Sequence, residues 1–383
     1  MGALSNTFNR FFESEKSGGI LLIACTALSL VLANSPLGLE YLGFWRLNAG
    51  GLSLEHWVND ALMAVFFLLI GLELERELYV GELSDFKNAL LPIVAAVGGM
   101  LAPALIHFSF NGGTPTQAGF GIPMATDIAF ALGVLAILGK RIPAPVKVFV
   151  VAFAVIDDLG AIVIIAAFYT AQLSFWYLVG ALSVWVLLIV LNRIFRVMSL
   201  VPYLLGGAMM WILMLNSGVH ATIAGVMLAF AIPFTAKDDD EQSPSHRLEH
   251  FLHKPVAFII LPIFALANTG VVVGTDWMQD IASANSVGIV AGLVAGKPLG
   301  VTLLCFAAVA SGICRLPPGV GWSHMIGAGI LGGIGFTMSI FIANLAFAAD
   351  PETINGSKMA ILLASLTAGM AGFLWLRLLG SPK

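Results

Sequence analysis

Two adjacent carboxylates lie inside a long apolar stretch of this chain. In VVAFAVIDDLGAIVIIAAF (150–168), Asp157 and Asp158 are the only charged residues. A charge in mid-bilayer costs at least about 2.5 kcal/mol, so such residues indicate a functional site. A carboxyl group removed from water holds its proton more tightly, two neighbouring carboxyl groups titrate as a unit, and carboxylate oxygens are ligands for hard cations. The pair therefore predicts a site that holds either protons or a small cation, as cation/proton exchange requires.

Other ionisable residues in apolar segments leave alternatives open. Neighbouring helical positions do not share a face, so one aspartate can line a cavity while the other pairs with Lys297. Asp127 is either a third cation ligand or a charge that balances helix ends. Asp60 alone is typical of a polar contact between helices, and His220 is either a satisfied polar group or a pH-linked position.

The composition indicates which elements position these groups. Of 383 residues, 59% are apolar and 10% charged, with a net charge of -4 and a mean hydropathy of +0.95. A membrane span takes about 20 residues, so we predict an all-α polytopic membrane protein with about 12 transmembrane helices in a single domain over 1–383. This composition excludes a soluble enzyme, a nucleic-acid binder and a disordered chain. The apolar runs lie near 18–36, 57–78, 89–110, 119–139, 145–170, 175–192, 199–217, 219–234, 254–273, 286–310, 323–348 and 358–378.

The basic residues predict the orientation of the chain. With a cytoplasmic N-terminus, fifteen of the 18 Lys and Arg residues are cytoplasmic, whereas only Arg46 and Lys358 are periplasmic and Lys297 is within a helix. We therefore expect both termini in the cytoplasm. Residues 20–33 resemble the apolar part of a signal peptide, but Glu13 and Glu15 offset the positive charge that a signal peptide needs. We expect a retained helix.

Two of the expected helices contain residues that interrupt a helix. Pro123 removes a backbone hydrogen bond next to Thr126 and Asp127. Four glycines fall within residues 329–335, which disfavours a regular helix. Half-helix ends carry about half a charge, positive at N-termini and negative at C-termini. We expect Asp127 near the N-terminal ends and Lys297 near the C-terminal ends to lower the energy of such breaks.

Eight segments match, in order, the motifs of one known family. They are VNDALMAVFFLLIGLELERE (58–77), ATDIAFALG (125–133), IDDLGAI (156–162), NSGVHATIAGV (216–226), RLEH (247–250), LPIFALANTGV (261–271), GKPLG (296–300) and GIGFTMSIFIA (333–343). Together they resemble the bacterial NhaA-type sodium/proton antiporters over nearly the whole chain. The resemblance implies an inverted repeat of helices 3–5 and 10–12 with two broken, crossed helices (4 and 11), an architecture for which this family is itself the established example. It also implies a small periplasmic β-hairpin at 47–52, used in dimer contact.

The resemblance further implies an electrogenic antiporter of the bacterial inner (plasma) membrane. Such a protein extrudes Na+ or Li+ from the cytoplasm in exchange for periplasmic protons, two per cation, and serves pH and Na+ homeostasis. It works by alternating access and is activated at alkaline pH. A homodimer in membrane lipid is implied, with no cofactor, no metal beyond the transported ions, no nucleic acid and no enzymatic activity.

Individual residues acquire expected roles from the same resemblance. Asp157, Asp158 and Thr126 match the cation and proton site, whereas Asp127 and Lys297 match charges beside the broken helices. The residues that match positions of pH response are Glu73, Arg76, Glu77, Glu249, His253 and His220.

Three departures from the family pattern fall on the predicted cytoplasmic side. Glu75 replaces a lysine in GLELERE, the loop TAKDDDEQSPSH (235–246) is unusually acidic, and Lys254 precedes Pro255. They leave the pH set point open, but not the transport chemistry.

Three other functions remain as alternatives. An intramembrane aspartyl protease needs facing aspartates on separate helices, for which Asp127 and Asp157 are the candidate pair. A prenyl-diphosphate transferase needs a further acidic residue and a basic diphosphate site, which IDDLGAI lacks. A passive channel responds only to voltage and concentration, whereas an exchanger builds or dissipates a pH gradient when Na+ is added.

Overall fold

The chain folds into two compact units, each built from segments that are far apart in sequence. A computed structural model describes residues 6–170, 173–235, 243–275 and 277–379. Unit 1 comprises Met1–Tyr41, Asp85–Ala161 and Asn268–Lys383, and unit 2 comprises Leu42–Ser84 and Ile162–Ala267. A single transport domain over 1–383 stays a prediction.

Unit 1 is helical and contains both of the expected broken helices. Three helices begin in one unit and end in the other: α2 (Gly38–Trp45), α7 (Ala144–Phe168) and α12 (Leu261–Asn268). The other elements of unit 1 are α1 (Asn6–Ala33), α5 (Phe86–Asn111), the 3₁₀ segment η3 (Pro115–Met124), α6 (Ile128–Leu138), η4 (Gly139–Arg141), α13 (Trp277–Ala282), α14 (Ala284–Ala291), the π-helical turn η6 (Gly292–Gly296), α15 (Lys297–Ala310), α16 (Trp322–Gly332), α17 (Phe336–Ala346) and α18 (Pro351–Leu379).

Unit 2 combines helices with one short hairpin. Its elements are β1 (Asn48–Ala49), β2 (Leu52–Ser53), α3 (Leu54–Trp57), the π-helical turn η1 (Val58–Leu62), α4 (Met63–Tyr79), η2 (Glu82–Ser84), α8 (Phe175–Arg193), α9 (Val201–Ser217), α10 (Ile223–Ala229), α11 (Pro244–Pro255) and the π-helical turn η5 (Val256–Ile260). α3, η1 and α4 form one continuous helical segment, as do α11, η5 and α12.

Many of these helices suit a membrane. Among the described residues, eight helices are long and apolar enough to cross a bilayer, and two bent helix pairs raise the number to ten. This confirms a mostly helical, multi-pass membrane protein. The count of 12 stays a prediction, because α9 has only 17 residues and α10 only 7.

Three predicted helix boundaries differ from the structure. The helix expected from residue 254 begins at Pro244, because the Ser243 hydroxyl accepts a hydrogen bond from the His246 amide and proline suits the first turn. α1 begins at Asn6 rather than near residue 18, since polar residues can continue a helix beyond its apolar part. The helix expected over 219–234 is confined to α10, because turns precede it.

Both predicted breaks are present in unit 1. Between η3 and α6, Ala125 and Asp127 have extended backbone, with ψ angles of 149° and 101°. α16 and α17 are separated by residues 333–335 and bent by 45° relative to each other. Each break exposes backbone groups that a regular helix would use internally, so other partners must satisfy them.

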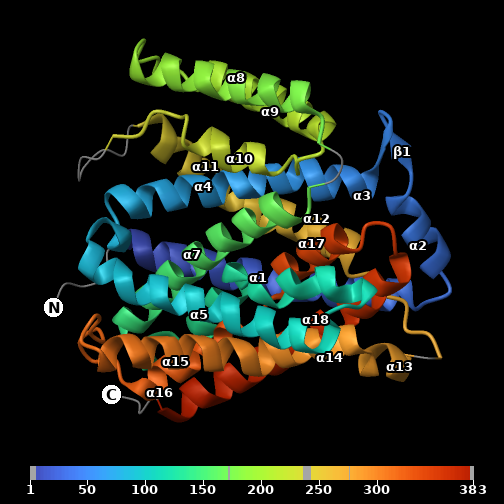
Figure 1. The fold of residues 1–383 in the computed structure, drawn as a ribbon, viewed down its shortest axis with the longest axis vertical. Coiled ribbons are helices and arrows are strands. Elements are labelled where there is room, and N and C mark those ends of the chain that lie inside the picture. Colours follow the sequence, from blue (N-terminus) through green and yellow to red (C-terminus); the bar gives the residue numbers. More distant parts are fainter. Residues whose placement is uncertain (1–5, 171–172, 236–242, 276, 380–383) are drawn as a thin grey trace. The chain divides into compact units, whose positions relative to one another are not determined.

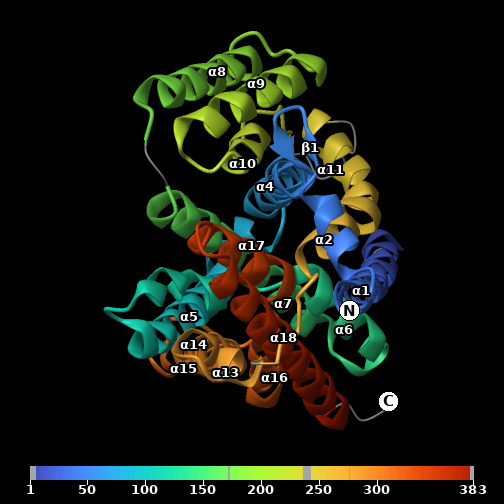
Figure 2. The ribbon, with the colours of Figure 1, turned by 90° about the vertical axis from the view of Figure 1, so that its right-hand side faces the viewer.

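Close helix packing surrounds these breaks. α5 lies alongside α14 and α15 (Figures 1 and 2). A Cβ atom at Gly300 would overlap the carbonyl oxygen of Gly98, so only glycine permits this approach of α15 to α5. α18 packs against α16 and α17, and α1 packs against α6.

The predicted hairpin is a two-stranded antiparallel sheet in unit 2. Asn48 pairs with Ser53 across it. Gly50 and Gly51 have φ angles of 65° and 93°, as a two-residue turn between such strands requires. In the same unit, α4 packs against α10 and α11, and α8 lies alongside α9 (Figures 1 and 2).

Candidate functional site

A buried ion pair joins α7 and α15 in unit 1. Lys297 Nζ is 2.5 Å from Asp157 Oδ2 and 2.9 Å from the Thr126 hydroxyl. All three side chains are 0% exposed. The ammonium group also lies 5.6 Å from the centre of the Phe153 ring. Because a buried charge is stable only when paired and hydrogen-bonded, these contacts hold Lys297 and Asp157 in one arrangement.

Asp158 is the neighbouring residue on α7 and is also buried, at 1% exposure. Consecutive helical residues point roughly 100° apart, so the two aspartates present different faces of the helix. The structure therefore brings Asp157, Thr126 and Lys297 into direct contact, with Asp158 close by.

Asp127 lies at the N-terminal ends of both helices that follow a break. Its Oδ1 accepts a hydrogen bond from the Phe130 amide of α6 at 2.8 Å. Its Oδ2 accepts from the Thr337 amide of α17 at 3.0 Å and from the Thr337 hydroxyl at 2.5 Å. A carboxylate at two positive helix ends is favoured electrostatically. That Asp127 balances these helix ends, and is not a cation ligand, stays a prediction.

The two breaks are also hydrogen-bonded directly to each other. The Asp127 amide donates to the Ile334 carbonyl at 2.6 Å. The Thr126 hydroxyl donates to the Gly332 carbonyl, at the C-terminal end of α16, at 2.9 Å. Lys297 contacts this hydroxyl, so its ammonium group lies near the negative end of α16 as well as beside Asp157.

Three hydroxyl residues at the breaks are not among the site residues that the sequence predicts. Thr337 binds Asp127, the Ser339 hydroxyl donates to the Ile122 carbonyl at 2.7 Å, and the Ser365 hydroxyl accepts from the Phe336 amide at 3.0 Å. Each forms a hydrogen bond with a backbone or carboxylate group that has no partner within its own helix at the break. Hydroxyls directly after a glycine run were the available signal for Thr337 and Ser339.

A second cluster of ionisable residues joins α4 to α11 in unit 2. Arg76 Nε is 2.9 Å from Glu249 Oε1, and Arg76 Nη1 is 3.1 Å from Glu77 Oε1. His253 Nε2 lies 3.5 Å from Glu73 Oε1 and 3.7 Å from Glu249 Oε1. Five of the six residues matched to pH response are thus brought together, and we call them the Glu249 cluster.

Glu75 extends this cluster. Its buried carboxylate accepts a hydrogen bond from the Ser245 hydroxyl at 3.1 Å, near the start of α11. A lysine here would present a donor to that hydroxyl in place of an acceptor. The acidic run of the neighbouring loop lies outside the described residues.

His220 is the sixth matched residue, and the structure does not place it in the Glu249 cluster. Its Nε2 lies 3.5 Å from Asp60 Oδ1, and its Nδ1 lies 2.9 Å from the Thr222 hydroxyl. Asp60 belongs to the turn before α4, whereas the Glu249 cluster contacts the last turns of that helix. Asp60 thus has a specific partner.

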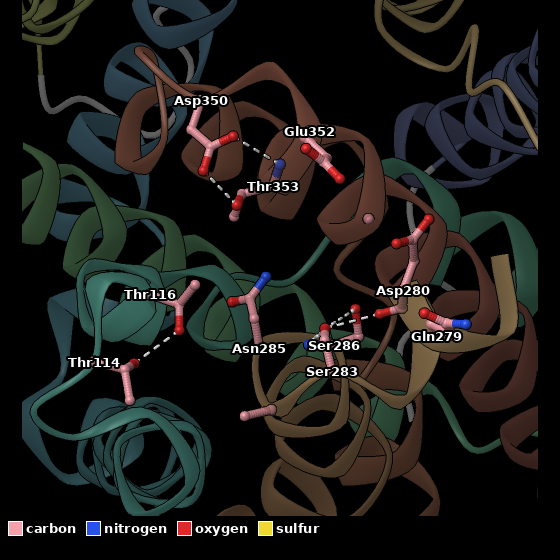
Figure 3. A pocket seen from close by; sticks show the side chains of 12 residues that line it. Thr114, Thr116, Gln279, Asp280, Ser283, Asn285, Ser286, Asp350, Glu352 and Thr353 are labelled. Atoms are coloured by element: carbon pink, nitrogen blue, oxygen red, sulfur yellow. Dashed lines mark hydrogen bonds between the residues drawn. The ribbon is translucent and has the colours of Figure 1, made fainter. Parts of the chain in front are cut away.

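A polar cavity of about 360 Å³ lies in unit 1 between the beginnings of α14 and α18. Figure 3 shows Asp350 and Thr353 facing Asn285 and Thr116 across it. Hydrogen bonds from the Thr353 hydroxyl at 2.6 Å and from the Thr353 amide at 3.1 Å hold the pKa of Asp350 below its usual value. The predicted site residues do not line this cavity.

Unit 1 thus contains two interrupted helices whose ends meet buried charges within a multi-pass membrane protein. Discontinuous helices of this kind are characteristic of secondary transporters. The chain belongs to the family described as Na+/H+ antiporter 1, whose profile matches residues 9–376. This is a family of transporters rather than of catalytic enzymes, and it is itself a standard example of that architecture.

Several curated relatives match the sequence of this chain along almost their full length. A protein of Dechloromonas aromatica (strain RCB) is 71% identical over 373 residues, which cover 97% of this chain and 96% of the relative. One of Cytophaga hutchinsonii is 58% identical over 375 residues, covering 98% and 96%. One of Helicobacter pylori (strain J99) is 46% identical, again covering 98% and 96%. Each is named Na(+)/H(+) antiporter NhaA.

Proposed function

We propose that this chain exchanges Na+ or Li+ of the cytoplasm for periplasmic protons, with two protons per cation. The observation that carries the proposal is the fully buried Asp157–Lys297 pair, with Asp158 beside it, at the contact of two broken helices. Membership of the Na+/H+ antiporter 1 family supports the choice of ions. Both termini lie in the cytoplasm and the protein resides in the inner membrane.

Coupling follows from competition for the carboxylates. In the described part of the chain, Asp157 Oδ1 has no hydrogen-bond partner, whereas Oδ2 accepts from Lys297. A cation that binds between Asp157 and Asp158 weakens the hold of Asp157 on the ammonium group. A buried ammonium group without its carboxylate is unstable and gives up its proton. Together with a proton from the aspartates, this releases two protons per cation and makes exchange electrogenic.

Asp127 and Lys297 have a second role in this proposal. Asp127 balances the positive ends of α6 and α17, and Lys297 lies near the negative end of α16. The balance keeps the broken segments stable while they reorganise during alternating access. The inverted repeat of helices 3–5 and 10–12, with helices 4 and 11 crossed, belongs to the same proposal.

Activation at alkaline pH is assigned to the Glu249 cluster. Its partly exposed histidine and arginine join α4 to α11, so a change in charge alters the contact between these helices. The hairpin β1–β2 is proposed as a contact in a homodimer, within membrane lipid.

Reconstituted proteoliposomes with an internal pH dye test the proposal. Addition of Na+ or Li+ should change an imposed pH gradient, K+ should not, and the response should increase from pH 6 to 8. A membrane potential should alter the rate, because two protons move per cation and one charge across 100 mV is worth about 2.3 kcal/mol. A response to voltage and concentration without any change in pH would indicate a channel instead.

A further inference from the structure

A buried histidine near the end of α5, His107, forms a chain of hydrogen bonds with two other helices of unit 1. Its Nε2 lies 3.1 Å from Asn285 Oδ1 of α14, and Asn285 Nδ2 donates to the Ser357 hydroxyl of α18 at 2.8 Å. His107 and Ser357 are 0% exposed, and Asn285, which also lines the polar cavity (Figure 3), is 5% exposed. Because an unpaired buried polar group is costly, these contacts hold α5, α14 and α18 in one arrangement.

The direction of these hydrogen bonds follows from the last member of the chain. The Ser357 hydroxyl donates to the Thr353 carbonyl at 2.7 Å, so it accepts from the amide nitrogen of Asn285. The Asn285 oxygen therefore faces His107, whose Nε2 carries the hydrogen. The other ring nitrogen, Nδ1, is buried and has no hydrogen-bond partner among the described residues. The imidazole thus serves as a donor to Asn285.

Asn111, one turn further along α5, extends this network to η3. Its side chain is fully buried, and its Nδ2 donates to the carbonyls of His107 and Ala284, both at 3.0 Å. Both amide hydrogens are thereby used, although Nδ2 also lies 3.4 Å from His107 Nε2. The Thr116 hydroxyl of η3 donates to Asn111 Oδ1 at 2.7 Å. The network therefore joins the first turn of η3 to α5 and α14.

Two glycines make room for the imidazole where η3 and α14 meet α5. A Cβ atom at Gly119 of η3 would lie 3.1 Å from both His107 Cε1 and Asn285 Oδ1. A Cβ atom at Gly288 of α14 would lie 3.0 Å from His107 Cδ2. Both distances are too short for ordinary contact, so only glycine allows the ring to pack directly against these two backbones.

The two backbones that enclose the ring both continue to the buried ion pair. η3 leads to Thr126, whereas α14 leads through the π-helical turn η6 to Lys297. They also touch along the way, because a Cβ atom at Gly292 of η6 would overlap Pro123 of η3. At the far end, Lys297 Nζ lies 2.9 Å from the Thr126 hydroxyl. Since close-packed interiors transmit strain, a shift of η3 along α14 at the His107 end changes the contact between Thr126 and Lys297.

We propose that His107 and Asn285 are positioning residues of the cation site. Their hydrogen bond fixes where η3 lies against α14, and it thereby places Thr126 beside Lys297. Without the bond, the Asn285 oxygen is buried without its donor, and η3 moves away from α14. A displaced Thr126 weakens the binding of Na+, whereas the carboxylates that exchange protons are retained. The effect therefore falls on the affinity for Na+ more than on the maximal rate, and this link to exchange rests on the proposed function.

Variants of His107 in the full-length protein test the proposal. In proteoliposomes, His107→Leu should raise the Na+ concentration for half-maximal exchange about fivefold and change the maximal rate by less than about twofold. His107→Gln keeps an amide donor that can reach Asn285, so it should restore most of the affinity. Ser109→Ala is the matched control, because Ser109 is an exposed residue of α5 whose hydroxyl donates to the Ile106 carbonyl of its own helix. An unchanged half-maximal Na+ concentration in His107→Leu would overturn the proposal.

A double variant separates positioning from stability. Combining His107→Leu with Asn285→Leu removes the unpaired oxygen together with its donor, and replacement of both partners by apolar groups can be nearly neutral. The melting temperature should therefore recover, whereas the half-maximal Na+ concentration should stay raised, because no hydrogen bond fixes η3. Recovery of both quantities would show that His107 acts only through stability, and it would overturn the positioning role.

Backbone hydrogen exchange in lipid nanodiscs gives a measurement that does not depend on transport. His107→Leu should accelerate exchange across η3 and leave α8 of unit 2 unchanged. Equal exchange of η3 in His107→Leu and the unchanged protein would refute the positioning role. Faster exchange of η3 in a protein that moves no Na+ would retain the positioning role and overturn the proposed function instead.

Discussion

The Asp157–Lys297 pair in unit 1 and the Glu249 cluster in unit 2 use the same kinds of side chain but differ in burial. Asp157 and Lys297 are both fully buried, whereas the side chains of Arg76 and His253 are 36% and 22% exposed. A buried charge has no solvent to replace a lost partner. For a partly exposed group, water can replace a lost partner. The Glu249 carboxylate also has two partners, Arg76 and His253.

This contrast indicates which region suits all-or-none binding of an ion and which suits a graded response to pH. The buried pair has few stable charge states, which suits the exclusive binding of either protons or a cation. The Glu249 cluster can lose one proton or one contact and keep the rest, which suits adjustment of a rate with pH. Each of the following changes tests one side of this contrast.

The largest expected effect is complete loss of exchange in Asp158→Asn. Asparagine keeps the shape of the side chain but has no titratable oxygen and no charge for a cation. In correctly inserted protein, Na+-dependent proton movement should fall to the background of empty vesicles. The matched control is Asp280→Asn on α13, which removes a carboxylate at the polar cavity. If Asp158→Asn still exchanged ions at the Na+ concentration used for the unchanged protein, the assignment of the site would be wrong.

The next effect is on stability. Asp157→Asn leaves Lys297 buried without its charged partner, and removal of one member of a buried pair costs about 3–5 kcal/mol. Arg76→Gln removes a partly exposed guanidinium group, and His253 still faces the Glu249 carboxylate after the change, so the cost should be smaller. The melting temperature in detergent should therefore fall much further for Asp157→Asn. Equal decreases would show that burial does not distinguish the two regions.

A smaller effect is a displaced pH profile in Glu249→Gln. The imidazolium form of His253 loses one of the two carboxylates that face it, so activation should move toward lower pH. The displacement should be less than about one pH unit, which corresponds to about 1.36 kcal/mol, because the Glu73 carboxylate still faces His253 after the change. Maximal exchange should be retained. A lower maximum with an unmoved profile would place Glu249 on the transport path.

The sequence predicted the buried charges more accurately than their partners. Two helix breaks were predictable, because Pro123 and the glycines of 329–335 act on the backbone locally. The position of Asp127 at helix N-termini was predictable as well, because a carboxylate is favoured next to their partial positive charge. The sequence does not decide whether Asp157 binds a cation or Lys297, since helical spacing gives the face of a residue but not which helix lies opposite.

Tertiary partners explain the remaining misses. Ser365 caps α17 from 29 positions away in sequence, and no local pattern marks it. The resemblance gives His220 as a further pH-linked position but names no partner for it, and the structure shows that the partner is Asp60, at the other end of α4 from the Glu249 cluster. The sequence gives no role to His56, because a histidine near the start of a predicted helix is uninformative until its partner, Asp60, is known.

The smallest expected effect belongs to Asp350, which completes the series from buried to exposed carboxylates. Its two hydrogen bonds from Thr353 precede α18, and they hold its pKa below the usual value. A lowered pKa in the folded state stabilises the fold above the ordinary aspartate value of about 3.9, and this contribution is lost as the pH falls further. Asp350→Ala should therefore lower the melting temperature slightly at pH 7 and not at pH 3. Glu352→Gln, which removes a neighbouring carboxylate at the same cavity, should leave it unchanged at both. The same decrease for Asp350→Ala at pH 3 and pH 7 would show that its carboxylate charge contributes nothing to the stability of the folded protein.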